Sequence, residues 1–127
     1  MTKIRHTVQP DQNIIEALRK IHSPVYDRKH NLYVYFNDDV VKKGETRFEH
    51  IAKRYHELKV RDINCLADGI HRYVMYRKSK EHKDTFYYFI NRKGMDKGFI
   101  QLAIKLIEGE TNKYYVKTIF ITYRLML

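Results

Sequence analysis

Residues 46–59 read TRFEHIAKRYHELK, and this stretch predicts a capped amphipathic helix. Thr46 and Glu49 form a capping box, in which a hydroxyl and a carboxylate three residues apart bind backbone N–H groups that the first helical turn leaves without partners. The apolar side chains recur at helical spacing and form the face that packs: Phe48, Ile51, Tyr55 and Leu58. We therefore expect one buried face, with the charged side chains arranged around it.

Two histidines and an arginine of this helix lie off its apolar face. At about 100° per residue, His50 and Arg54 lie together on one flank, and His56 lies on the other. Imidazole changes charge near neutral pH, and the planar guanidinium fork matches a phosphate. The pair therefore suits acid–base chemistry at a phosphate. A solvated basic helix face without chemistry is the alternative interpretation.

Outward from this helix, the chain predicts two further helices and one strand. Asp11 caps a first helix at about 11–22, which ends before Pro24 because the residue preceding a proline avoids helical angles. Residues 32–36, LYVYF, are rich in strand formers and precede a polar turn. A shorter helix ends near Gly69, and its inward side chains are Ile63, Leu66, Ala67 and Ile70.

The second half of the chain predicts four strands. β-Branched and aromatic residues are concentrated at 73–77, 85–91, 99–107 and 114–123, with charged or glycine-containing connections between them. Short links favour an antiparallel arrangement, so the predicted fold class is α+β, with N-terminal helices packed on a four-stranded antiparallel β-meander. Alternation in the last strand places these side chains on one face: Tyr114, Val116, Thr118, Phe120 and Thr122.

Length and composition indicate a single domain, 1–127. The chain has 127 residues, of which 43% are hydrophobic, and this is enough to form a modest core. The single Cys65 excludes an intrachain disulfide and is too few for a structural zinc site. No apolar run has the length of a membrane span and no secretory signal is evident, so we expect a cytoplasmic protein. No sequence pattern predicts a metal site, and no cofactor is expected.

The net charge of +10 is unevenly distributed. Residues 42–93 hold fourteen Lys and Arg against seven Asp and Glu. This concentration points to a polyanion, most simply nucleic acid, although an acidic protein or an anionic membrane surface fits the same charge. Tyr87, Tyr88 and Phe89 are candidates for base stacking, and alternation places at least one of them in the core. The candidate phosphate-binding cations are Arg47, Lys53, Arg77, Lys78 and Lys80.

The order of these features resembles the barnase–EndoU–colicin–RelE-like nuclease superfamily, in its phage-associated branch. There, a helix with an HI-x-x-RH motif precedes a meander whose last strand carries a Ser or Thr. Here, HI-x-x-R spans residues 50–54, and the strand motif is Val116, Thr118 and Phe120. The resemblance covers residues 31–124, which correspond to a nuclease-like core that follows the N-terminal helix.

The resemblance implies a metal-independent endoribonuclease of a phage or mobile element, which cleaves RNA through attack of the 2′-OH and acts as a toxin. The implied partners are RNA and an acidic antitoxin or inhibitor protein. His50 would be the acid–base residue, Arg54 would clamp the phosphate and Thr118 would orient it. Tyr123 or His56 would be the second proton donor.

One departure from the family pattern keeps a second function class open. Tyr55 stands where the family has its second histidine, and His56 follows one position later. This shift favours a non-catalytic module of a mobile element that binds nucleic acid or protein, such as an inhibitor of host defence. Salt-dependent affinity without turnover would distinguish such a module from an enzyme.

Overall fold

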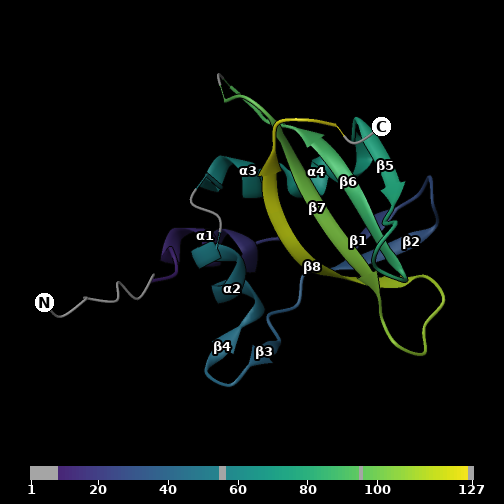
Figure 1. Cartoon of the computed structure of the whole chain (residues 1–127), viewed down its shortest axis with the longest axis horizontal. Coiled ribbons are helices and arrows are strands. Elements are labelled where there is room, and N and C mark those ends of the chain that lie inside the picture. Colours follow the sequence, from purple (N-terminus) through teal and green to yellow (C-terminus); the bar gives the residue numbers. More distant parts are fainter. Residues whose placement is uncertain (1–8, 55–56, 95, 126–127) are drawn as a thin grey trace, which may run out of the picture.

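The structure is a computed structural model that describes residues 9–54, 57–94 and 96–125, with the backbone but not the side chain of Arg54. Its elements are shown in Figure 1. The helices are α1 (Gln12–Arg19), α2 (Arg47–Arg54), α3 (Val60–Asn64) and α4 (Leu66–His71). The strands are β1 (Val25–Asp27), β2 (Leu32–Tyr35), β3 (Val40–Lys42), β4 (Glu45–Thr46), β5 (Met75–Lys78), β6 (Thr85–Asn91), β7 (Phe99–Leu106) and β8 (Lys113–Thr122).

The main sheet has six strands in the order β1-β2-β8-β7-β6-β5, and β3 and β4 form a separate hairpin. The antiparallel run β5 to β8 is the meander that the sequence predicts, and the α+β class is confirmed. The prediction of a four-stranded sheet is wrong, because β2 pairs in parallel with β8 and β1 pairs with β2. A parallel pair needs a long crossover, which α2 to α4 and the meander supply here.

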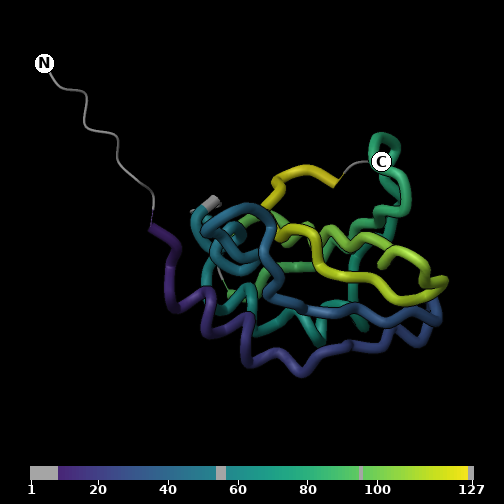
Figure 2. Tube along the Cα trace, turned by 90° about the horizontal axis from the view of Figure 1, so that it is seen from below, coloured from purple at the N-terminus to yellow at the C-terminus, as the bar shows by residue number. Residues whose placement is uncertain are grey.

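The sheet curls until its two ends face each other. Figure 2 shows β1 and β2 running along one side, below β7 and β8. The Tyr88 hydroxyl on β6 donates to Oδ2 of Asp27 on β1 at 2.5 Å. The His30 ring stacks on Tyr76 of β5, with centroids 3.8 Å apart. Side-chain contacts, rather than backbone hydrogen bonds, therefore join β1 to the β5–β6 hairpin.

Helices from both parts of the chain share one hydrophobic core with the inner face of the sheet. α1 buries Ile14, Ile15 and Leu18 in this core, so the N-terminal helix is part of the same unit as residues 31–124. α4 approaches β6 closely because Gly69 has no side chain: a Cβ there would lie 2.5 Å from Cγ2 of Ile90. Among the described residues, no helix is long and apolar enough to cross a bilayer.

The helix boundaries differ in detail from the sequence prediction. The capping box at the start of α2 is confirmed, since the Thr46 N–H donates to Oε1 of Glu49 at 2.9 Å and the Glu49 N–H donates to the Thr46 hydroxyl at 3.4 Å. The predicted continuation of this helix to Lys59 is wrong, because residues 57–59 are not helical. The first helix ends at Arg19 rather than near residue 22, and the predicted shorter helix is the pair α3 and α4.

The last strand departs from strict alternation. The pairing between β7 and β8 shifts so that Ala103 opposes Thr118 whereas Ile104 opposes Val116, which leaves Lys117 as the extra residue of a β-bulge. Val116 and Ile119 are both fully buried in the core as a result. The predicted common face for Val116 and Thr118 is therefore wrong, and Thr118 lies on the outer face of the sheet.

Candidate functional site

A pocket of about 260 Å³ lies where the β3–β4 hairpin, α2 and β8 meet. Its walls come from three separate segments of the chain: Val41, Lys42, Glu45, Arg47, His50, Lys117 and Thr118. In Figure 1, α2 and the β3–β4 hairpin lie on the side of β8 away from β7. The fold thus brings His50 and Thr118 together in one cationic pocket, although they are distant in sequence.

His50 is held by a buried carboxylate. Its Nδ1 lies 2.7 Å from Oε1 of Glu45, which is 7% exposed. Lys53 forms an ion pair with the other oxygen of Glu45, and Nζ of Lys42 lies 3.9 Å from Oε1. The contact with Lys53 holds the pKa of Glu45 below its ordinary value against the opposing effect of burial, and His50 adds to this shift. The carboxylate therefore stays ionised beside the imidazole at neutral pH.

Arg47 fastens α2 to β8 at the edge of the pocket. Its guanidinium binds both carboxylate oxygens of Asp39, with N–O distances of 2.6 and 3.0 Å, and donates to the Lys117 carbonyl at 3.1 Å. It also lies over the Tyr115 ring, 4.8 Å from the centroid. Arg47 holds the pKa of Asp39 below its ordinary value. These contacts fix the position of His50, one turn along α2, relative to Thr118 on β8.

The Thr118 hydroxyl is buried and has no hydrogen-bond partner in the part of the chain that the structure describes. An unpaired buried hydroxyl costs folding free energy, and such groups are rare in native proteins. An oxygen of a ligand in the pocket would give this hydroxyl an acceptor. Thr118 is therefore suited to orient a bound anion.

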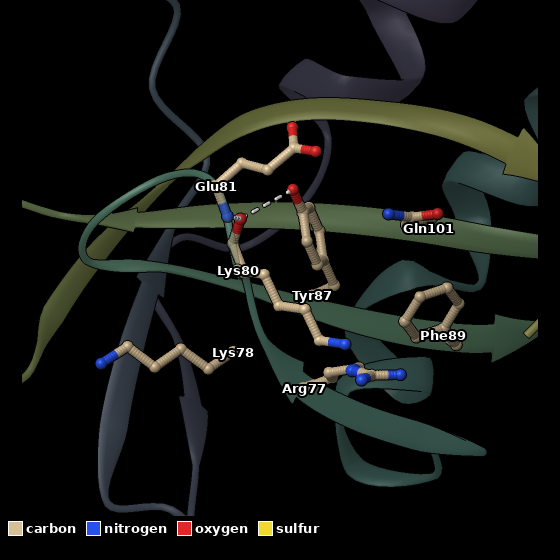
Figure 3. Close-up of a pocket in the computed structure, with 8 residues that line it drawn as sticks. Arg77, Lys78, Lys80, Glu81, Tyr87, Phe89 and Gln101 are labelled. Atoms are coloured by element: carbon tan, nitrogen blue, oxygen red, sulfur yellow. Dashed lines mark hydrogen bonds between the residues drawn. The ribbon is translucent and has the colours of Figure 1, made fainter. Parts of the chain in front are cut away.

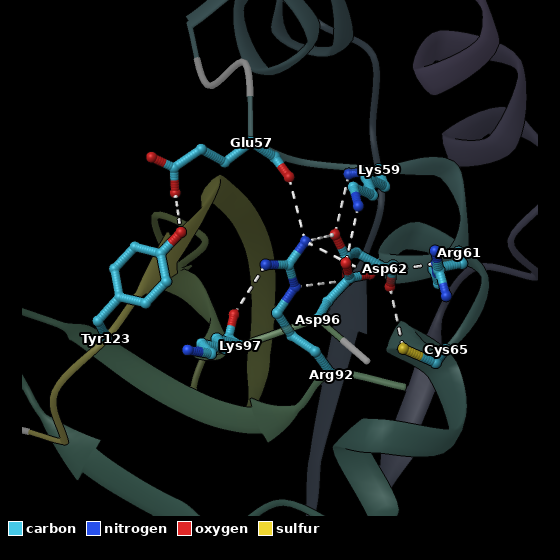
Figure 4. A network of polar contacts seen from close by, with 9 residues as sticks. All are labelled: Glu57, Lys59, Arg61, Asp62, Cys65, Arg92, Asp96, Lys97 and Tyr123. Atoms are coloured by element: carbon cyan, nitrogen blue, oxygen red, sulfur yellow. Dashed lines mark hydrogen bonds and ion pairs between the residues drawn. The ribbon is translucent and has the colours of Figure 1, made fainter. Parts of the chain in front are cut away.

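The remaining predicted catalytic residues are not brought to this pocket by the described structure. Arg54 lies on α2, but its side chain is outside the described part, as is the whole of His56. The Tyr123 hydroxyl donates to Oε2 of Glu57 at 2.6 Å, and this hydrogen bond raises its pKa. Figure 4 shows Tyr123 next to the ion-pair network around Arg92, and Tyr123 is not among the residues that line the pocket.

The five predicted cation sites fall into two groups. Arg47 and Lys53 are at the His50 pocket, where each pairs with a carboxylate. Arg77, Lys78 and Lys80 line a second pocket of about 270 Å³ at the β5–β6 hairpin, shown in Figure 3. The other residues of this second pocket are Ser79, Glu81, Tyr87, Phe89 and Gln101.

Glu45 is the site residue that the sequence reasoning missed. It precedes α2 and belongs to a short hairpin strand, so helical spacing could not relate it to His50. The available signal was the turn at Lys43-Gly44, where Gly44 has a φ of +79° and reverses the chain into β4. A predicted hairpin there would have placed Glu45 at the N-terminal end of α2.

Within the described residues, no group of three or more His, Cys, Asp or Glu side chains is arranged to hold a metal ion. Comparison of the chain with protein-family models, with curated proteins and with solved structures finds no match.

Proposed function

We propose that this protein is an endoribonuclease that cleaves RNA through attack of the 2′-OH and requires no metal ion. The observation that carries this proposal is the pocket whose lining includes the Glu45-held imidazole of His50 together with Thr118, Lys42 and Lys117. The resemblance to the barnase–EndoU–colicin–RelE-like superfamily supports the same reaction.

In the proposed reaction, a base removes the proton of the 2′-OH, and the 2′-oxygen attacks the adjacent phosphorus. The bond from phosphorus to the 5′-oxygen breaks, an acid protonates the departing oxygen, and a 2′,3′-cyclic phosphate remains. His50 is assigned to one of these proton transfers. The contact of Nδ1 with Glu45 favours the tautomer in which Nε2 is the basic nitrogen.

The second proton transfer requires another group. His56, which lies outside the described residues, stays a prediction for this role. Tyr123 is not assigned, because its hydroxyl is bound to Glu57 outside the pocket. Thr118 would orient the phosphate, and Lys42 and Lys117 would stabilise the negative charge that builds on its oxygens.

A toxin of a phage or mobile element is the biological setting that we propose for such an enzyme. The cluster of positive charge at residues 42–93 suits RNA and also an acidic inhibitor protein that would cover the pocket. The second function class, a binding module without turnover, is favoured by the family histidine that is displaced to His56.

The test is cleavage of RNA by the purified protein in EDTA. We expect products with a 2′,3′-cyclic phosphate, and we expect His50→Ala to lower kcat at least about a hundredfold while the variant still folds, as judged from its melting transition. RNA that carries 2′-O-methyl groups should bind but not be cut. Cleavage of the blocked RNA at the rate of normal RNA would refute the chemistry. Salt-dependent binding without any turnover would identify the binding module instead.

A further inference from the structure

The His50 pocket and the hairpin pocket lie on the same face of the sheet. Arg77 on β5 lies opposite Tyr87 on β6, and Tyr87 lies opposite Ala103 on β7. Ala103 in turn lies opposite Thr118 on β8, so one row of side chains crosses the four strands. Directly opposed residues on neighbouring strands project to the same side. Three strand spacings separate the ends of the row by about 14 Å.

The hairpin pocket has the components of a nucleobase site. Tyr87 and Phe89 project from the same strand, with ring centroids 6.4 Å apart and an interplanar angle of 62°. The Tyr87 hydroxyl donates to the Ser79 hydroxyl at 3.3 Å, which fixes the ring beside the hairpin turn. The Gln101 side chain adds an amide, which has a donor and an acceptor to offer a base edge.

The cations of this pocket are placed unequally. In Figure 3 the side chains of Arg77 and Lys80 extend along the same side as Tyr87 and Gln101, whereas Lys78 points away from them. A guanidinium beside aromatic rings can stack on a base or bind a phosphate. Phe89 is fully buried and supports Tyr87 from below, so the partly exposed Tyr87 ring is the stacking surface. This ring, an amide and cations in a pocket of about 270 Å³ suit a single nucleotide of single-stranded RNA.

We propose that the hairpin pocket binds a base of the RNA substrate close to the phosphate that is cleaved at His50. Tyr87, the stacking residue, lies two strand spacings, or about 10 Å, from Thr118 along the row, so its base and the phosphate bound at Thr118 would belong to neighbouring positions of the RNA. Ala103 is 2% exposed, so a strand of RNA that crosses β7 there would contact the neighbouring side chains of the row and not Ala103 itself. This inference rests on the proposed function, since both pockets would hold the same RNA.

The test uses fluorescently labelled, uncleavable 2′-O-methyl oligoribonucleotides of U, C, A or G, with binding measured by fluorescence anisotropy. We expect Tyr87→Ala to weaken binding of the preferred oligonucleotide about tenfold, because a stacking partner is lost. Gln101→Leu should reduce the difference in affinity among the four oligonucleotides. If Tyr87→Ala does not fold, as judged from its melting transition, Gln101→Leu still decides the question.

A charge control separates a base site from a diffuse field. Arg77→Gln and Lys83→Gln each remove one positive charge from the hairpin, but Lys83 is exposed and does not line the pocket. Arg77→Gln should weaken binding several-fold more than Lys83→Gln. Equal losses in these two variants would overturn the proposal, as would unchanged affinity and unchanged base preference in the variants of Tyr87 and Gln101.

Failure of this inference can be told apart from failure of the proposed function. Cleavage of normal RNA together with binding that does not depend on Tyr87 would refute only the base site. Binding that depends on Tyr87 without cleavage would support the base site and refute only the nuclease activity.

Discussion

Glu45 determines how the His50 ring is presented to the pocket. A carboxylate that is 7% exposed requires compensation of its charge, which Lys53 and the imidazole supply. In the proposed reaction Glu45 acts through its contact with the His50 ring, so it is a positioning residue. We expect Glu45→Gln to lower kcat about tenfold to a hundredfold with little change in KM, because the orientation and tautomer of the imidazole are lost. Steady-state kinetics on a short RNA measure both constants.

Lys53→Gln is the matched control for that variant. It removes the ion pair on one oxygen of Glu45 but leaves the contact between the other oxygen and His50. Lys53→Gln should lower kcat clearly less than Glu45→Gln does. The comparison is made at a temperature at which both variants are fully folded. Equal losses would show that local charge, and not orientation of the imidazole, is what the pocket needs.

Among the elements, the end of β6 is fastened to α3 by a buried ion pair. The Arg92 and Asp62 side chains are 5% and 0% exposed, and two N–H groups of the guanidinium donate to the carboxylate at 3.0 and 2.9 Å. Arg92 also donates to the carbonyls of Glu57 and Lys97, so it holds the connection between α2 and α3, as Figure 4 shows. The paired carboxylate raises the pKa of Arg92.

Because a lone charge would remain buried, we expect Arg92→Met to lower the free energy of unfolding by about 3–5 kcal/mol. Urea denaturation followed by circular dichroism measures this loss. The double variant Arg92→Met with Asp62→Asn removes both charges and should be more stable than Arg92→Met alone. A double variant that is less stable than the single one would contradict this account of the pair.

The elements that sequence could predict are those with local signals. The cap at Thr46, the apolar face of α2 and the four strands of the meander follow from residues that are close in the chain. The bulge at Lys117 and the parallel pairing of β2 with β8 depend on packing between distant segments, for which one sequence holds no local signal. The sequence therefore predicts His50 and Thr118 as site residues. Glu45 could be found only with the β3–β4 hairpin known.

For the whole molecule, the contact of Asp27 with Tyr88 and His30 closes the curled sheet. Asp27 is 2% exposed. Its Oδ2 contacts the Tyr88 hydroxyl and the His30 ring, and its Oδ1 accepts hydrogen bonds from the backbone N–H groups of Lys29 and His30. Burial raises the pKa of Asp27, but the hydrogen bonds from Tyr88 and His30 outweigh it, so this pKa lies below its ordinary value. Burial and the neighbouring Asp27 raise the pKa of Tyr88, which stays a hydrogen-bond donor.

A lowered carboxylate pKa has a defined effect on stability. The stabilisation by ionised Asp27 is complete above its unfolded-state pKa of about 3.9 and is lost as the pH falls through the lower folded-state value. We expect Tyr88→Phe, which removes a hydrogen bond to a charged group, to cost about 1.5–3 kcal/mol at neutral pH. Asp27→Asn should destabilise the protein at neutral pH, and its deficit should shrink below about pH 4. Urea denaturation at several pH values measures both, and a deficit of Asp27→Asn that grows in acid would contradict the assignment.

The charge of the whole molecule predicts how binding of RNA depends on salt. Of the net charge of +10, residues 42–93 carry +7. Cations of this segment line both pockets, and Lys117 of β8 adds one to the His50 pocket. For a single strand, the logarithm of the affinity falls linearly with the logarithm of the salt concentration, with a slope of about −0.7 for each phosphate neutralised. An RNA that reaches from one pocket to the other must therefore show a steeper slope than an RNA held in one pocket.

The contribution of each pocket to that slope can be measured by removing one cation from each. Replacing Lys80 in the hairpin pocket and Lys117 in the His50 pocket by Gln should make the slope for an uncleavable oligoribonucleotide shallower by about 1.4. Lys20 and Lys97 are exposed and line neither pocket, so replacing both by Gln removes the same charge and should leave the slope close to that of the unaltered protein. An equal change in the two double variants would mean that the RNA senses only net charge. The row from Arg77 to Thr118 would then not be its path across the sheet.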